Sequence, residues 1–155
     1  MITIKDLTVK NFMSVGNVTQ AVRFTNNGLT LVLGNNVDLG GDGSRNGTGK
    51  TTIINALSYA IYGNALTNIR KDNLINKTNG KSMLVTLDFV KDGIQYRIER
   101  GRKPNVLKYY VNDQNVDEDE AQGENRQTQA QIEKLFGMSH DMFKHIVALN
   151  TYTEP

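Results

Sequence analysis

The chain has 155 residues and a net charge of +2, from 18 lysines and arginines against 16 aspartates and glutamates. Hydrophobic residues make up 38% and charged residues 22%, which excludes a disordered tail and a membrane-embedded chain. The absence of cysteine excludes disulfides, zinc–thiolate sites and cysteine nucleophiles. The N-terminus carries no basic and apolar signal regions, so we expect a cytoplasmic domain, or a piece of a larger one, without membrane contact.

Three short strands are predicted in the first third of the chain. Residues 2–9 are rich in Ile, Thr and Val, and residues 18–24 alternate less cleanly between apolar and polar side chains. Residues 29–33 form a mostly apolar run that ends at Gly34. Such an abrupt end is typical of a buried strand followed by a loop.

A helix and a hairpin are predicted next. Residues 50–62 place apolar side chains on one face at helical spacing, and Gly63 is a plausible C-terminal stop. Residues 83–89 and 94–99 alternate as strands do. Asp92-Gly93 joins them, and this dipeptide favours a tight turn that needs positive φ at both positions.

The last third predicts a strand and two helices. Residues 106–111 extend the meander, and the acidic residues 117–120 indicate a solvated loop. A helix then ends at Gly137, and Ser139 caps another over residues 140–148. The order of elements predicts a mixed α/β fold.

The most informative stretch runs from Ser44 to Thr52 and reads Ser-Arg-Asn-Gly-Thr-Gly-Lys-Thr-Thr, between a predicted strand and a predicted helix. A phosphate-binding loop requires this context. Gly47 and Gly49 let backbone N–H groups converge on phosphate oxygens, and the helix points its positive end at the same anion. Three further side chains complete a predicted site for Mg-ATP: Lys50 for the β- and γ-phosphates, Thr51 for Mg²⁺, and Thr52 for the α-phosphate.

The start of this loop departs from the usual pattern. The glycine expected four residues before the Gly49-Lys50 pair is replaced by Ser44, and Gly34 and Gly43 are both candidates for the opening turn. Residues 35–43 then form an insertion. A glycine-rich surface turn is the alternative interpretation, which the strand before and the helix after disfavour.

Three segments resemble the N-terminal lobe of SMC-like DNA-repair ATPases, and among these the SbcC-type exonuclease subunits: residues 4–14, 31–34 and 46–63. Residues 71–76, 100–105 and 136–144 are similar to the phage branch of this family, the recombination endonuclease ATPase subunits. The resemblance implies an α/β P-loop NTPase fold. Specifically, it implies the N-lobe of an ABC-type ATPase head, with an antiparallel β-meander and flanking helices.

The resemblance also implies a function for residues 1–155 as the N-terminal ATP-binding lobe. In the family a coiled coil and a C-lobe follow, and the C-lobe supplies the signature motif and the catalytic acid. Two heads sandwich two ATP molecules, and ATP binding closes the dimer, clamps DNA and controls a nuclease subunit. We therefore expect four partners, namely the C-lobe, a second head, DNA and the nuclease, and negligible hydrolysis by this chain alone.

Site residues carry over position by position. Residues 46–52 match the phosphate loop, residues 11–14 match the first turn near the nucleotide, and Asn150 falls where the family's Gln loop begins. The resemblance thus implies catalytic roles for Lys50 and Asn150, and Mg²⁺ contacts for Thr51 and Asn150. The residues that it assigns to the nucleotide are Ser14, Ser44, Asn46, Gly47, Thr48, Gly49, Lys50, Thr51 and Thr52.

Two other functions stay open on the sequence: a stand-alone nucleotide- or DNA-binding regulatory module without hydrolysis, and a small phosphate-loop kinase. The meander after the helix counts against a kinase, which needs an acceptor pocket and lid arginines there. Asp88 closes an apolar run and is either a metal ligand or, as its alternation favours, a polar-face residue.

Three further groups have alternative interpretations. The cations Arg97, Arg100, Arg102, Lys103 and Lys108 form either an ordinary solvated face or a surface for DNA phosphates. Tyr109-Tyr110 could stack on bases, although such pairs more often pack across strands. His140 and His145 do not share a helical face, which indicates helix-end or surface histidines instead of metal ligands.

Overall fold

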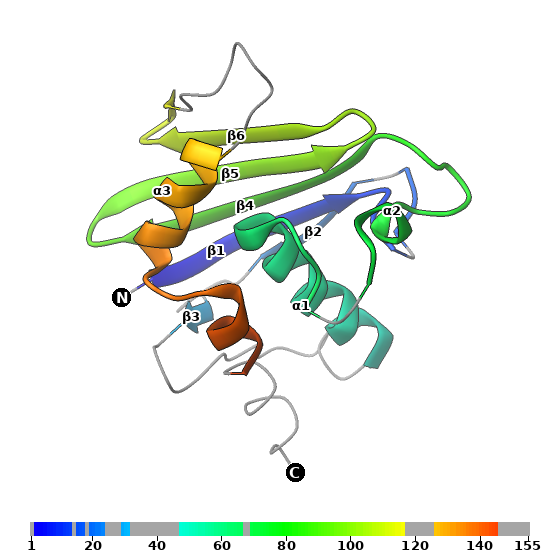
Figure 1. The fold of residues 1–155 in the computed structure, drawn as a ribbon, viewed down its shortest axis with the longest axis horizontal. Coiled ribbons are helices and arrows are strands. Elements are labelled where there is room, and N and C mark those ends of the chain that lie inside the picture. The colour runs from blue at the N-terminus through cyan, green and yellow to red at the C-terminus, as the bar shows by residue number, and fades with distance from the viewer. Residues whose placement is uncertain are drawn as a thin grey trace.

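The computed structural model describes residues 2–13, 15–17, 19–23, 29–31, 47–66, 69–116 and 126–145, with the backbone alone for 22–23, 29–31 and 47–51. The strands in these ranges are β1 (Ile2–Lys10), β2 (Gln20–Arg23), β3 (Leu29–Leu31), β4 (Met83–Lys91), β5 (Ile94–Arg102), β6 (Val106–Val111) and β7 (Gln114–Asn115). The helices are α1 (Gly47–Tyr62), α2 (Lys71–Leu74) and α3 (Arg126–Phe136). Figure 1 shows α1 and α3 lying across the same face of the sheet.

The described strands form one antiparallel sheet in the order β2-β1-β4-β5-β6-β7, with β3 also paired to β1. β4 lies along the whole of β1, so β2 and β3 share its other edge, one after the other. The predicted strands 18–24 and 29–33 are confirmed over 20–23 and 29–31. Thr19 is described and lies outside β2, and residues 18, 24 and 32–33 lie outside the described residues.

The predicted meander is confirmed. β4 and β5 meet at Asp92 and Gly93, whose φ values are 52° and 81°, as a two-residue turn between twisted strands requires. The same geometry recurs at Asn112 and Asp113, with φ values of 48° and 69°. This second turn starts the short hairpin of β6 and β7, which the sequence analysis did not predict.

Strand alternation divides the side chains between two faces. A register shift between Ile4 and Asp6 marks a bulge in β1, so Ile4 and Leu7 both face inward although they are three residues apart. The inward faces of β1 and β4 carry most of the buried sheet residues: Ile2, Ile4, Leu7, Val9, Met83, Val85, Leu87 and Phe89. α1, α3 and the residues after α3 cover this apolar face.

Helix α1 begins three residues earlier than predicted, at Gly47 instead of Lys50. The first turn of a helix makes no intrahelical N–H bonds, so residues 47–49 belong to the helix and still keep free donors. Gly63 ends the helix as predicted, with φ of 78° and its N–H bonded to the Tyr59 carbonyl at 2.7 Å.

The C-terminal helices also follow the prediction. α3 ends at Phe136, and Gly137 adopts φ of 71°. Ser139 Oγ then accepts the Met142 N–H at 3.1 Å and caps a helical segment at residues 140–145. The expected continuation to residue 148 and the acidic run at 117–120 lie outside the described residues. The one-turn helix α2 was not predicted.

Gly101 provides a test of how closely β4 and β5 pack. A Cβ at this position would lie 2.3 Å from the Met83 carbonyl oxygen, which is backbone and cannot move aside. We expect Gly101→Ala to lower the free energy of unfolding by about 2–3 kcal/mol in urea denaturation, because the strands must separate.

Gly16→Ala is the matched control for this change, because its Cβ would meet nothing nearer than Asn79 Nδ2 at 3.8 Å. Equal stability of the two variants would contradict the close strand contact.

Candidate nucleotide site

The phosphate-loop residues lie at one end of α1. Gly47, Thr48, Gly49, Lys50, Thr51 and Thr52 follow one another in its first two turns. Thr52 is buried, and only the backbone is described for the five residues before it. Four other predicted site residues lie outside the described residues: Ser14, Ser44, Asn46 and Asn150.

The first turn of α1 fits a phosphate group. Its leading N–H groups have no intrahelical partner and carry the positive end of the helix dipole. The turn contains no acidic residue to repel an anion. Gly47 and Gly49 have no Cβ, which leaves room for close approach to the backbone. Lys50 adds a formal positive charge, and the hydroxyl of Thr51 is an oxygen ligand of the kind Mg²⁺ takes.

The opposite end of α1 is fixed by a guanidinium. Arg100, from β5, is largely removed from water and donates to the carbonyls of Ala60 at 3.1 Å and Ile61 at 3.4 Å. Gln129, from α3, accepts from Arg100 and donates to the Ile61 carbonyl at 3.0 Å. Burial lowers the pKa of Arg100 to about 10, so it keeps its charge at neutral pH against the negative end of the helix.

The basic residues that lie close together in the sequence from Arg97 to Lys108 do not form a single surface. Arg100 points to the helix side of the sheet, and Arg97 points to the other because strand residues alternate. Arg97 pairs with Asp88 at 2.7 Å, which confirms Asp88 as a polar-face residue. Sequence proximity on β5 therefore does not place these two cations together.

The two neighbouring tyrosines, Tyr109 and Tyr110, also lie in different surroundings, and so do His140 and His145. Tyr109 is buried and stacks on Tyr96 at 6.2 Å between ring centroids, so packing accounts for it. Tyr110 lies on the opposite face. His140 begins the 140–145 segment and contacts Ser58 of α1, whereas His145 is exposed. Among the described residues, no group of three His, Asp or Glu side chains could hold a metal ion.

A different basic surface forms where two segments of the chain meet. Residues 69–82 and 102–105 contain a single carboxylate, that of Asp72. The positive charges of Arg102, Lys103 and Arg70 lower its pKa, with the Arg102 hydrogen bond as the largest cause. We call this surface the basic end; its cations are Arg70, Lys71, Lys77, Lys81, Arg102 and Lys103. Sequence reasoning named only Arg102 and Lys103 of this set, because the other cations lie up to 33 positions away along the chain.

Side-chain amides hold the loop of the basic end in place. Asn79 donates to Asn11 Oδ1 at 2.7 Å, and Asn11 donates to Asn17 at 3.0 Å. Asn76 donates to the Met13 carbonyl at 3.0 Å. The turn after β1 and the loop that carries Lys77 are therefore bound to each other.

The comparisons with known proteins agree with this fold. A family model described as an AAA domain matches residues 6–153. The chain belongs to this family of P-loop NTPases.

No helix in the described part of the chain is long and apolar enough to cross a membrane.

Two individual relatives show which proteins of this family the chain is similar to. The chain is 37% identical to "Exonuclease subunit 2" of Enterobacteria phage T4 over 142 residues, which is 92% of this chain and 23% of that protein. It is 32% identical to "DNA double-strand break repair Rad50 ATPase" of Archaeoglobus fulgidus over 100 residues, or 64% of this chain and 10% of that one. The chain thus spans about a quarter or less of these relatives.

A solved structure shares the fold. The Smc head domain of Pyrococcus furiosus, bound to the C-terminal domain of ScpA, superposes with a TM-score of 0.52 at 20% identity. The match covers 91% of this chain and 35% of that one. Together with the relatives, it confirms the expected N-terminal lobe of the SMC-like and SbcC-type ATPases.

Arg97 and Arg100 test the division between the two faces of the sheet. Arg100→Gln should lower the free energy of unfolding by about 2–3 kcal/mol, because it leaves buried carbonyls at the end of α1 without their donor. Arg97→Gln should cost less than about 1 kcal/mol, because half of its side chain is exposed and its ion pair is in water. Urea midpoints at constant m-value measure both, and a reversed order would contradict the assignment.

Proposed function

We propose that residues 1–155 form the N-terminal ATP-binding lobe of the ATPase subunit of an exonuclease complex for DNA double-strand-break repair and recombination. The observation that carries the proposal is the first turn of α1, which presents Gly-Thr-Gly-Lys-Thr and no acidic residue. Membership of the AAA domain family and the likeness to phage exonuclease and Rad50 subunits support it.

Each site residue has a role in this proposal. The N–H groups of residues 47–50 bind phosphate oxygens, and Lys50 neutralises charge on the β- and γ-phosphates. Thr51 and Asn150 hold Mg²⁺, and Thr52 lies on the α-phosphate side. Ser14, Ser44 and Asn46 complete the nucleotide contacts. Bound Mg²⁺ would draw electron density from the phosphates, which is the chemistry that it supplies in such sites.

The rest of the activity depends on other parts of the assembly. In this proposal a C-lobe and a second head complete the site, and ATP binding closes the two heads around DNA and controls a nuclease subunit. The complex acts in the cytoplasm, which is that of the host cell if a phage encodes it. This chain alone binds Mg-ATP weakly and hydrolyses it negligibly, because the family's catalytic acid lies in the C-lobe.

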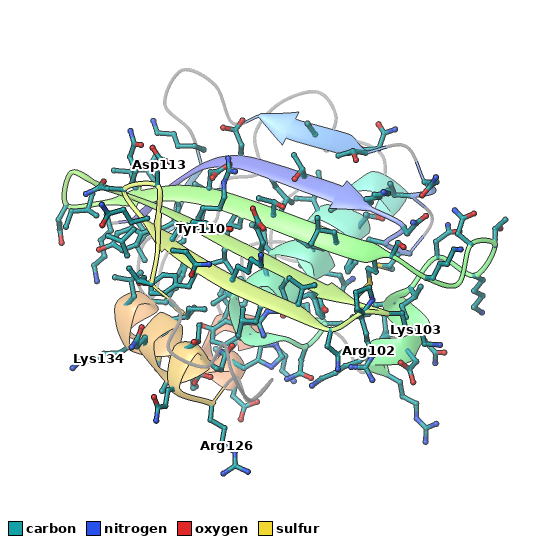
Figure 2. All side chains as sticks on the ribbon, turned by 90° about the horizontal axis from the view of Figure 1, so that it is seen from above. Arg102, Lys103, Tyr110, Asp113, Arg126 and Lys134 are labelled. Atoms are coloured by element: carbon teal, nitrogen blue, oxygen red, sulfur yellow. The ribbon has the colours of Figure 1, made fainter. Side chains whose placement is uncertain are left out.

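The basic end is the surface that we assign to DNA. Lys71, Lys77, Lys81 and Lys103 are exposed, and the Asp72 carboxylate is engaged by Arg102 at 2.7 Å. Figure 2 shows Arg102 and Lys103 together beside α2, whereas Lys134 and Arg126 project from α3. Contacts from such cations to phosphates fix the position of a protein on DNA.

Nucleotide binding is tested with Lys50→Ala. We expect its dissociation constant for ATP in Mg²⁺ to rise about 100-fold or more, since one charge-assisted contact to phosphate contributes about 3 kcal/mol. Titration calorimetry of the full chain measures the change. Lys134→Ala, an exposed lysine on α3, is the control and should bind as the parent does.

Two results would contradict the proposed function. Equal ATP affinity of the parent and Lys50→Ala would remove the phosphate loop as the site. Turnover by the isolated chain that Lys50→Ala abolishes would show that no C-lobe is needed, and a regulatory module without hydrolysis would also be excluded.

DNA binding at the basic end is tested by its salt dependence. Replacing Lys77, Lys81 and Lys103 together by Gln should weaken binding to duplex DNA and lower the slope of log K against log salt by about 2–3, because each phosphate contact contributes about 0.9. Fluorescence anisotropy between 50 and about 200 mM salt covers the useful range. A variant with Lys134→Gln and Arg126→Gln should keep the parent slope, and an unchanged slope in the triple variant would refute the assignment.

A further inference from the structure

Asn11 lies at the point where the loops of the basic end meet. It directly follows β1 and is buried. Its amide Nδ2 donates to Asn17 Oδ1 at 3.0 Å and to the Ser82 carbonyl at 3.3 Å. Its Oδ1 accepts from Asn79 Nδ2 at 2.7 Å. One buried amide therefore joins three separate loop positions, and both of its protons are used.

The exposed lysines of the basic end lie next to these contacts along the chain. The residue that donates to Asn11 Oδ1 lies between Lys77 and Lys81, and both lysines are exposed. Ser82, whose carbonyl accepts from Asn11, donates its own N–H to the Lys103 carbonyl at 2.8 Å. Asn11 is thus linked through short paths to the backbone that carries all three lysines.

A second amide shapes the loop that carries Lys77. Asn76 Oδ1 accepts the N–H groups of Thr78 at 3.1 Å and Asn79 at 3.2 Å, which closes a tight turn. The backbone N–H of Asn76 donates to the Asn11 carbonyl at 2.8 Å. Asn11 therefore holds this turn at both of its ends, by its carbonyl at the start and by its side chain at the end.

The backbone at this end is held in an uncommon conformation. Positive φ is rare for residues other than glycine. Seven such residues occur in the described ranges, and three of them belong to hairpin turns. The other four lie at the basic end or against it, with φ between 52° and 57°: Asn11, Met13, Ser82 and Lys103. Such conformations persist where surrounding contacts over-determine them, and they are frequent at binding sites.

We propose that Asn11 is a positioning residue for duplex DNA, which holds the loops of Lys77, Lys81 and Lys103 in one arrangement before DNA arrives. The proposal rests on the proposed function, because that function assigns the basic end to DNA. Asn11 itself is buried and does not touch the DNA. Loops that are already ordered need not be ordered on binding, which lowers the cost of association.

The stiffness of the ligand decides how much this positioning matters. Duplex DNA has a persistence length of about 150 base pairs, so its phosphates cannot move to meet displaced cations. A single strand bends and can follow them. Asn11 therefore favours duplex over single-stranded DNA.

The test compares binding of the full chain to duplex and to single-stranded DNA of equal length, by fluorescence anisotropy without nucleotide. Asn11→Gly removes the amide and keeps the backbone conformation, because glycine adopts positive φ readily. We expect duplex binding to weaken about tenfold and single-strand binding less than about twofold. The slope of log K against log salt should keep the parent value, because every lysine is still present.

Two further variants locate the effect. Asn79→Ala removes a partner of Asn11 from the exposed side of the loop and should also weaken duplex binding more than single-strand binding. Asn73→Ala, on the exposed surface of α2, is the control and should bind both forms of DNA as the parent does.

A double-mutant comparison separates positioning from a general structural role. In a chain with Lys77, Lys81 and Lys103 replaced by Gln, Asn11→Gly should cause no further loss of duplex affinity, because the cations that it positions are gone. A general loss of structure would lower affinity in this background as well.

Several outcomes would overturn the proposal. They are parent-like duplex binding by Asn11→Gly, an equal loss for duplex and single strand, and a further loss in the background without the three lysines. If the chain without these lysines binds duplex as the parent does, the assignment of DNA to the basic end fails instead, and the inference with it. Thermal unfolding identifies any variant that fails to fold, and Asn79→Ala carries the test if Asn11→Gly does not fold.

Discussion

The phosphate-loop helix is held at its C-terminal end by a buried cation, and the site depends on that constraint. Arg100 donates to the carbonyls of Ala60 and Ile61, where the helix dipole is negative. The negative end of the helix thus faces this cation, and Gln129 bridges it to α3, where Glu133 adds a negative charge. At the other end of the helix, the N–H groups of the first turn have no intrahelical partner.

Because side chains alternate along a strand, one face of the sheet packs against the helices and the other carries charged residues. On β5, Arg100 and Ile98 face the helices, while Arg97 and Glu99 face away. Arg97 forms ion pairs with both Glu99 and Asp88. Charges on the open face are therefore largely compensated. The excess positive charge gathers instead at the basic end, where turns and α2 bring separate segments together.

The relatives are several times longer than this chain. A first turn of α1 can bind and orient a triphosphate, but its own residues include no acid to activate water. The contacts between α1 and the 138–143 segment fix the position of this segment on the helix. In the proposed function, nucleotide binding belongs to this lobe and turnover belongs to the assembly.

The sequence by itself determined the local features. Asp92-Gly93, Gly63 and Gly137 were predicted from the backbone angles that turns and helix ends require, and Gly47–Thr51 from the needs of a phosphate. The tertiary structure decided which side chains meet. It buried Arg100 against α1, divided it from Arg97, and joined Ser58 to His140 across 82 positions. Such contacts depend on strand register and on how helices cross the sheet, and these arise only when the whole apolar face is buried.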